Sequence, residues 1–495
     1  MIDRYADKEI KEIWSDANKL KLWQEVELAV IEARVESGEI TKKDFLQIQK
    51  TLKENPIDIG WWLAKEEEIK HDLNAFVEER RRFLLPHLQR YFHELITSYD
   101  TEEPAFATIL KDSLEIVEEH QAELVEVLTK IAEIYRFTIM NARTHGQEAK
   151  LQSFGKRISC WIVDLRLDSE ILEKAEDCLD YSKLSGAVGN YGSISPHLEK
   201  KALEILDFEP YSGATQIMPR EIYAPLAYAL CQLVMTLQKI ALSIRLGARS
   251  GRPIFQEPFS KKQIGSSAMP HKKNTIATEQ IEGMSRMAKG YLNMIIENIT
   301  TWEERAIEQS CVERVAWPDL FHVTIHSLKT MTKVLNDLVV HQDNMLLEII
   351  ESRGTYASDE AKELLKEFCV CHDITAEECY RMIQLASFNA FEPRKEAESL
   401  RLNQVKSLEE SGRMLSEFAQ IPAREPVSIK DIIAKGELRL SPQLAATVED
   451  IAKWNAILKE VFEDTENIRR WEQIFTPSYL LRNEAMLYAK ILNIE

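Results

Sequence analysis

A seam of mostly apolar side chains in the second hundred residues most constrains the fold of this 495-residue chain. Three and four residues apart along the chain stand Leu114, Val117, Gln121, Leu124, Leu128, Ile131 and Tyr135. This spacing predicts one long helix with a continuous seam on one side. Such a seam must be buried against neighbouring helices, so the sequence predicts a bundle.

Three further stretches have the same character, at about residues 222–245, 278–299 and 317–350. Gly and Pro number only 16 each, so residues that interrupt helices are scarce. We therefore predict an all-α fold of three helical domains with a central long-helix bundle. The predicted domains are residues 1–113, residues 114–365 and residues 366–495. The charged segment 391–440, with three prolines, is predicted to be an insertion or surface excursion.

The charge and cysteine content narrow the possible partners and the compartment. A net charge of −19 argues against nucleic acid or an anionic membrane as the main partner, because both favour basic surfaces. An anionic ligand would need a local basic pocket. We see no signal peptide and no apolar run of membrane-spanning length, and seven scattered cysteines suit a reducing cytoplasm. The loose cluster of Cys369, Cys371, His372 and Cys379 has poor spacing for zinc, so we expect no metal site.

The stretch with the most chemistry is the decapeptide Gly265–Asn274, within a predicted loop of residues 259–276. Gly265 allows a tight turn and Pro270 stiffens the middle. Hydroxyl, ammonium and amide groups stand within ten residues, so the segment can combine a proton acceptor with an anion clamp. A predicted helix follows.

Five other islands of polar residues are scattered along the chain. They are Arg4-Tyr5, Lys70-His71-Asp72, His93 with Thr97-Ser98, Arg143-Thr144-His145-Gly146-Gln147, and Trp302-Glu303-Glu304-Arg305 with Ser310 and Arg314. Any one of them alone is more often a helix cap or a surface contact than a site. The order of all five islands along the chain is what indicates a functional site.

The decapeptide resembles the signature of the fumarase/aspartase superfamily, and His271-Lys272 is most similar to the adenylosuccinate lyase branch. The five islands stand in the order of that branch, over roughly residues 1–365. The resemblance implies anti β-elimination of fumarate from N6-succinyl-AMP, giving AMP. It also implies the same reaction on the succinylated imidazole carboxamide ribotide SAICAR, giving AICAR. No metal or organic cofactor is implied, and the chain would form a homotetramer that completes the bundle, with each active site built from three subunits.

The same resemblance implies a role for individual residues. Ser266 would be the general base, His145 the general acid, and Glu279 would orient a histidine. Lys272 would hold carboxylate oxygens, and His71 would lie near the reacting end. The residues implied to bind substrate are Arg4, Tyr5, Lys70, Asp72, His93, Thr97, Ser98, Thr144, Gln216, Ser267, Lys273, Asn274, Arg305, Ser310 and Arg314.

The chemistry suits these residue types. Removing a proton beside a carboxylate builds a doubly charged intermediate, which needs cationic and hydrogen-bonding groups already in place. A serine hydroxyl can act as the base where a nearby ammonium stabilises its anion. A histidine that titrates near neutral pH can protonate the leaving nitrogen.

Several positions depart from the family pattern. These are Leu95, Glu102, Glu103, Pro104, Leu151-Gln152-Ser153, Thr275, Glu303, Ala306 and Gln309. Two additional acids near a dianion site would repel the substrate unless they point away. Two alternatives therefore stay open. One is a superfamily lyase with another succinyl substrate, or a relative of muconate cycloisomerase, and the other is a nucleotide-binding homologue without catalysis.

Overall fold

The computed structural model describes residues 1–266, 268–269, 271–392 and 427–492. They form two compact units. The first unit comprises Met1–Val127, Trp161–Ala248 and Gln256–Val339, and the second comprises Leu128–Cys160, Arg249–Phe255 and Val340–Glu495. The boundaries at residues 113 and 365 stay a prediction.

Short helices open the first unit. They are α1 (Lys8–Ile13), α2 (Asp16–Glu36), α3 (Lys42–Glu54), α4 (Ile59–Ile69), α5 (Asp72–Arg81) and α6 (Pro86–Gln89). The side chains of Ser15 and Thr41 accept backbone N–H groups at the starts of α2 and α3, which explains where these helices begin. Helix α9 (Pro196–Ile205) packs on α2, so residues far along the chain complete this core.

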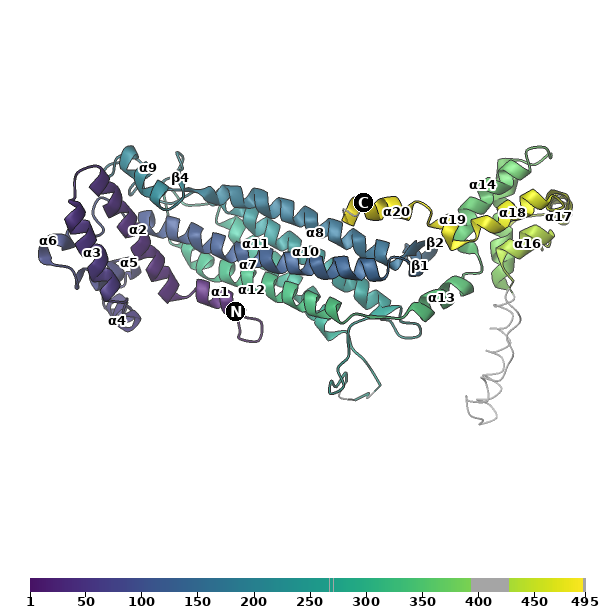
Figure 1. Ribbon diagram of the computed structural model, residues 1–495, viewed down its shortest axis with the longest axis horizontal. Coiled ribbons are helices and arrows are strands. Elements are labelled where there is room, and N and C mark those ends of the chain that lie inside the picture. Colours follow the sequence, from purple (N-terminus) through teal and green to yellow (C-terminus); the bar gives the residue numbers. More distant parts are fainter. Residues whose placement is uncertain (267, 270, 393–426, 493–495) are drawn as a thin grey trace. The chain divides into compact units, whose positions relative to one another are not determined.

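Long helices make up most of the remaining first unit and lie side by side in Figure 1. They are α7 (Ser98–Ile134), α8 (Phe154–Glu176), α10 (Ala224–Gly247), α11 (Ile276–Glu297) and α12 (Glu308–Asn336). Helix α7 after Val127 and helix α8 before Trp161 belong to the second unit. The predicted seam is buried from Leu114 to Ile131, and Gln121 donates to the Leu165 carbonyl of α8 at 2.7 Å. Gln232 of α10 donates to Asp168 of α8 at 2.8 Å. The all-α prediction is therefore confirmed.

Strands in the described residues form three two-stranded sheets. They pair β1 (Ile139–Thr144) with β2 (Gln147–Ser153), β3 (Tyr181–Ser182) with β4 (Glu209–Pro210), and β5 (Phe255–Gln256) with β6 (Val339–Val340). The short 3₁₀ helices are η1 (Asp177–Asp180), η2 (Arg220–Ile222) and η3 (Thr355–Ala357).

Two sequence predictions about helices need correction. The stretch 317–350 is not one helix, because α12 ends at Asn336, β6 follows, and α13 (Gln342–Glu351) starts anew. Residues Arg220–Gly247 are long and apolar enough to cross a membrane by length and composition alone, which the sequence prediction overlooked. In the structure α10 is a core helix, because it packs against α11 and α12 and most of that stretch is buried.

The second unit has its own core around Trp454 and Trp471. Besides α13, its helices are α14 (Ser358–Phe368), residues 376–392, α16 (Ile429–Lys435), α17 (Val448–Val461), α18 (Thr465–Ile474), α19 (Pro477–Leu480) and α20 (Glu484–Leu492). Most of the segment predicted to be an insertion, residues 393–426, lies outside the described residues.

Candidate active site

The start of α5 positions the first island. Lys70 ends α4 in the left-handed region, with φ 55°, and its ammonium pairs with Glu67 at 2.5 Å. His71 is the N-cap of α5, and its Nδ1 accepts the Asn74 N–H at 3.3 Å. Asp72 Oδ2 accepts a hydrogen bond from the Arg314 guanidinium at 2.7 Å. The structure thus joins two predicted site residues that are 242 positions apart.

A buried ion pair holds the Thr97-Ser98 segment at the start of α7. Asp100 accepts the Thr97 N–H at 2.8 Å and pairs with the Lys183 ammonium at 2.7 Å. Lys183 also donates to the Gln216 carbonyl at 2.9 Å. Because Asp100 and Lys183 are fully buried, they fix the segment and Gln216 in one arrangement.

His93 lies against the buried carboxylate of Glu27, with 2.7 Å between Nδ1 and Oε1. Its backbone N–H donates to the same carboxylate at 2.8 Å. Thr101 of α7 donates to Glu27 as well, at 2.8 Å. These contacts give His93 a place in the framework behind Thr97-Ser98, and its predicted contact with substrate stays a prediction.

Arg305 is held by two groups of the first unit. Its Nη1 lies 3.5 Å from Gln216 Oε1, and its guanidinium lies 4.1 Å from the centre of the Tyr99 ring. Gln309 donates to the Tyr99 hydroxyl at 3.4 Å. An arginine over an aromatic face keeps its outward N–H groups available, which suits an anion ligand.

Glu103, one of the departures from the family pattern, lies in a buried cluster. Its carboxylate accepts from Arg220 at 2.7 Å, from the Met218 N–H at 3.1 Å and from the Tyr223 hydroxyl at 2.9 Å. Glu313 of α12 binds the other side of Arg220 at 2.8 Å. The acid that was expected to repel substrate is therefore neutralised within the fold.

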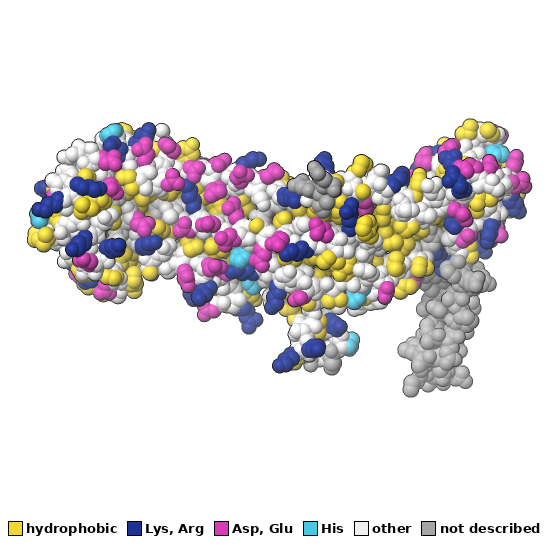
Figure 2. Space-filling view, in the orientation of Figure 1, with side chains coloured by type: hydrophobic (Ala, Val, Ile, Leu, Met, Phe, Trp, Pro, Cys, Tyr) yellow, Lys and Arg dark blue, Asp and Glu magenta, His cyan; other side chains and the backbone are white. Residues whose placement is uncertain are grey.

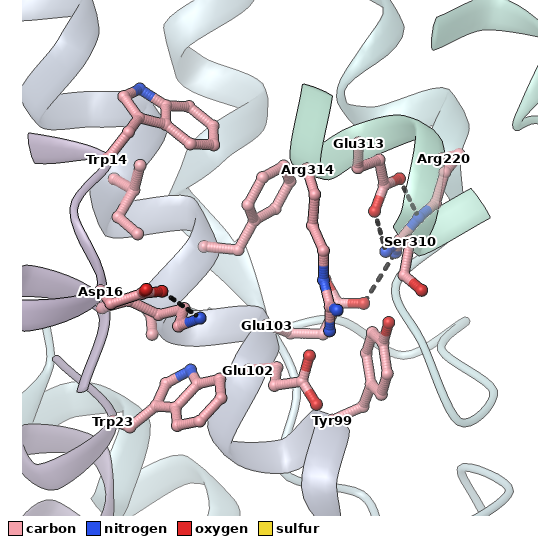
Figure 3. Close-up of a pocket in the computed structure, with 14 residues that line it drawn as sticks. Trp14, Asp16, Trp23, Tyr99, Glu102, Glu103, Arg220, Ser310, Glu313 and Arg314 are labelled. Atoms are coloured by element: carbon pink, nitrogen blue, oxygen red, sulfur yellow. Dashed lines mark hydrogen bonds and ion pairs between the residues drawn. The ribbon is translucent and has the colours of Figure 1, made fainter. Parts of the chain in front are cut away.

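Glu102 lines a pocket of about 250 Å³ together with Ser310 and Arg314 (Figure 3). Trp14, the C-cap of α1, and Trp23 of α2 form its apolar wall. Burial, reinforced by the charge of Asp72, raises the pKa of Glu102 to about 8. At neutral pH this second departure from the family pattern is therefore mostly uncharged.

The predicted signature loop is stabilised at both of its ends. Asn274 Nδ2 donates to the Gly265 carbonyl at 2.7 Å, and a Cβ on Gly265 would lie 2.1 Å from the Lys272 carbonyl oxygen. Only glycine fits this closure. Ser266 is half-buried, and its Oγ accepts the Met269 N–H at 3.1 Å. Ser267 lies outside the described residues.

The loop leads into α11, whose first N–H groups are bound by Glu257. Its carboxylate accepts from Thr278 N at 2.6 Å and from Ala277 N at 3.2 Å. Glu279 lies 3.5 Å from Arg245 and accepts a 3.4 Å hydrogen bond from Thr275. In this chain Glu279 therefore contacts an arginine and a threonine, and its orientation of a histidine stays a prediction.

Thr144 and His145 lie in the second unit, at the tip of the hairpin formed by β1 and β2. His145 and Gly146 both have positive φ, 53° and 75°, as a two-residue hairpin turn of this kind requires. Helix α7 ends at Ile134, so this island lies on the hairpin that follows the helix. The imidazole is exposed on the turn, where it is free to meet a ligand.

The remaining predicted residues lie in the first unit. Tyr5 meets the His326 ring edge-on with 5.2 Å between centroids, and Arg4 is exposed. Ser310 is buried and donates to the Ile307 carbonyl at 3.0 Å. The Lys273 ammonium lies 5.6 Å from the centre of the Phe259 ring.

Several residues that support the site were given no role in it by the sequence prediction. These are Trp14, Trp23, Glu27, Tyr99, Asp100, Lys183 and Arg220. Lys183 offered a signal, since a lysine in the Gly- and Ser-rich stretch 182–193 stands out. The partners of Glu103 could not be recognised in the sequence, because they come from elements that are distant along the chain.

Comparison with known proteins identifies the family of this chain. Residues 2–290 match the family described as "Lyase". Adenylosuccinate lyase of Thermotoga maritima is 35% identical over 78% of this chain and 87% of its own length. The Synechocystis enzyme of the same name is 34% identical over 79% and 89%.

Solved structures share the fold. A fumarate lyase from Mesorhizobium sp. BNC1 has a TM-score of 0.72 at 17% identity and covers 95% of this chain and 98% of its own. The β-carboxy-cis,cis-muconate cycloisomerase of Acinetobacter calcoaceticus has a TM-score of 0.69 at 17% identity, covering 97% and 98%. The chain therefore belongs to this lyase family, in the branch of the adenylosuccinate lyases, and is a carbon–nitrogen lyase.

Proposed function

We propose that this enzyme cleaves N6-succinyl-AMP to AMP and fumarate, and SAICAR to AICAR and fumarate. One observation carries the proposal. In the first unit Arg314 binds Asp72 and Arg305 contacts Gln216, while Asp100 and Lys183 connect the Thr97-Ser98 segment to Gln216. Two arginines near hydroxyl and amide groups suit a substrate that carries both a phosphate and carboxylates.

In the proposed mechanism Ser266 takes a proton from the carbon beside a carboxylate. Lys272 and Asn274 hold the negative charge that develops on the carboxylate oxygens. His145 donates a proton to the departing nitrogen from the opposite side, which completes an anti elimination. The substrate's own carboxylate stores the charge, so the mechanism asks for no metal or organic cofactor.

We also propose a cytoplasmic homotetramer, and the bundle surface supports the tetramer. Tyr228, Met235, Leu242 and Leu246 of α10 are exposed at heptad spacing. Met287 and Met294 form a similar pair on α11, and hydrophobic side chains are visible along the central helices in Figure 2. An apolar stripe of this kind suits packing against a second copy of the chain.

Comparing substrates tests the chemistry. The enzyme is expected to release fumarate from adenylosuccinate and from SAICAR, and none from argininosuccinate or aspartate. Release of fumarate from argininosuccinate alone would contradict the proposed substrates and would assign the enzyme the substrate of another branch of the superfamily.

Mixing variants tests the shared site. Ser266→Ala and His145→Ala, each inactive alone, should regain part of the activity after the subunits are mixed and reassembled. Recovery is expected because some sites then receive Ser266 and His145 from different chains. A mixture that stays inactive while forming mixed tetramers would contradict the sharing of sites between subunits.

A further inference from the structure

Glu102 occupies a position that the proposed mechanism does not use. It lies on α7, one helical turn after Ser98, and therefore on the same face as the proposed carboxylate-binding hydroxyl. It lines the 250 Å³ pocket with Arg314 and Ser310 (Figure 3). Among the residues that the structure describes, its carboxyl makes no hydrogen bond or ion pair.

Most charges around this pocket are already paired. Arg220 of η2 binds Glu103 of α7 and Glu313 of α12. Lys19 pairs with Asp16 at 2.8 Å on α2. The phenol of Tyr99 stays neutral, because burial raises its pKa far above its usual value. Together these groups carry one net negative charge, which lies in the buried cluster around Arg220.

Four charged groups remain to decide anion binding: Arg314 of α12, Arg305 of the preceding segment, Asp72 of α5 and Glu102. Asp72 already contacts Arg314 at 2.7 Å. When Glu102 is ionised, two arginines face two carboxylates and a dianion meets no net attraction. When Glu102 is protonated, these four groups carry one net positive charge for the anion.

We propose that Glu102 makes anion binding at Arg314 conditional on a proton. The pocket accepts the phosphate of the nucleotide when Glu102 is a neutral carboxylic acid, whose O–H donates to a phosphate oxygen. No covalent bond changes, and the proton comes from solvent. The identity of the anion rests on the proposed function, whereas the dependence on Glu102 rests on the charges of this pocket.

The proposal predicts a particular split between kinetic constants. Free Glu102 titrates with a pKa of about 8, and a bound dianion favours its protonated form still more. Above that pH, binding must take up one proton, so KM rises by about tenfold per pH unit. The value of kcat changes little, because the proton is already in place once substrate is bound.

Calorimetric titration with AMP between pH 7.5 and 9.5 tests this inference. The phosphate of AMP is fully ionised over that range. Running each titration in two buffers of different ionisation heat counts the protons taken up. The wild-type protein should take up close to one proton per AMP at pH 9, and above the pKa of Glu102 it should lose about tenfold in affinity per pH unit.

Glu102→Gln keeps a hydrogen-bond donor without titrating. This variant should take up no proton and bind AMP with the same affinity at pH 7.5 and 9.5. Glu119→Gln, an exposed position on the same helix, should behave like the wild-type protein. If Glu102→Gln does not fold by circular dichroism, Glu102→Met gives the same comparison of proton uptake.

Sulfate separates this inference from the proposed function, because it stays a dianion throughout the range. If the protein binds sulfate with proton uptake but does not bind AMP, the proposal that the ligand is a nucleotide is wrong and the proposed role of Glu102 still holds. Proton uptake that persists in Glu102→Gln would overturn the inference. So would a wild-type protein that binds AMP and sulfate without uptake, or binds neither.

Discussion

Arg220 and Arg314 line the same pocket but differ in surroundings and exposure. Arg220 is only 3% exposed and binds two carboxylates and a backbone carbonyl. Arg314 is 59% exposed and contacts one carboxylate, that of Asp72. Contacts within the fold offset the cost of desolvating the Arg220 guanidinium, whereas the Arg314 guanidinium keeps N–H groups available for a ligand. The comparison separates an arginine that holds elements together from one that is available to bind substrate.

Removing Arg220 is expected to have the largest effect on stability. Arg220→Met leaves Glu103 and Glu313 buried without their cation, at a cost of about 3–5 kcal/mol in the free energy of unfolding. Urea denaturation measures this loss. Arg469→Met, which breaks an exposed pair with Glu466, is the matched control and should leave the urea midpoint nearly unchanged. An equal loss of stability in both variants would show that the buried contacts of Arg220 stabilise the fold no more than an exposed ion pair does.

Removing Arg314 should affect binding and spare the fold. Arg314→Gln loses a charge-assisted contact with the substrate, worth about 1.5–3 kcal/mol, so KM should rise by about 10- to 150-fold. Unfolding in urea should change by less than about 1 kcal/mol, since the contact with Asp72 is largely exposed. An unchanged KM in a folded variant would show that Arg314 does not contact the substrate.

A smaller effect distinguishes Glu102 from its neighbour Glu103. The pKa of Glu102 is about 8 in the folded protein against 4.5 for the free group, so the folded state holds the proton more tightly. Stability from this group is complete below about pH 4.5 and declines as pH rises toward 8. The Glu102→Gln variant lacks this decline. The difference between its melting temperature and that of the wild-type protein should therefore increase by about 2–4 °C in favour of the variant from pH 5 to pH 9.

The comparison with Glu103→Gln sharpens that result. Because Glu103 is bound to Arg220 in the buried cluster, this variant should be less stable than wild type at pH 7. Differential scanning calorimetry measures both variants. A Glu102→Gln variant whose melting temperature follows the wild-type curve at every pH would contradict the raised pKa.

The sequence predicted the long helices because their periodicity is local. Helices α10 and α11 begin and end within two residues of the predicted bounds, whereas α12 and α13 were merged because the residues between them contain no proline or glycine. The two acids after Ser98 were recognised as unusual. Glu103 is neutralised by Arg220, which stands 117 positions away along the chain. Glu102 instead has a raised pKa because it is buried. Pairings over such distances leave no trace in local spacing.

The most direct test of the central claim is a product assay on the wild-type enzyme at pH 7, with adenylosuccinate as substrate. Chromatography should find AMP and fumarate in equal amounts over many turnovers. Ser266→Ala should lower the rate by about 100- to 10,000-fold, as expected for loss of a general base. Tight nucleotide binding without fumarate, or an unchanged rate in Ser266→Ala, would contradict the claim.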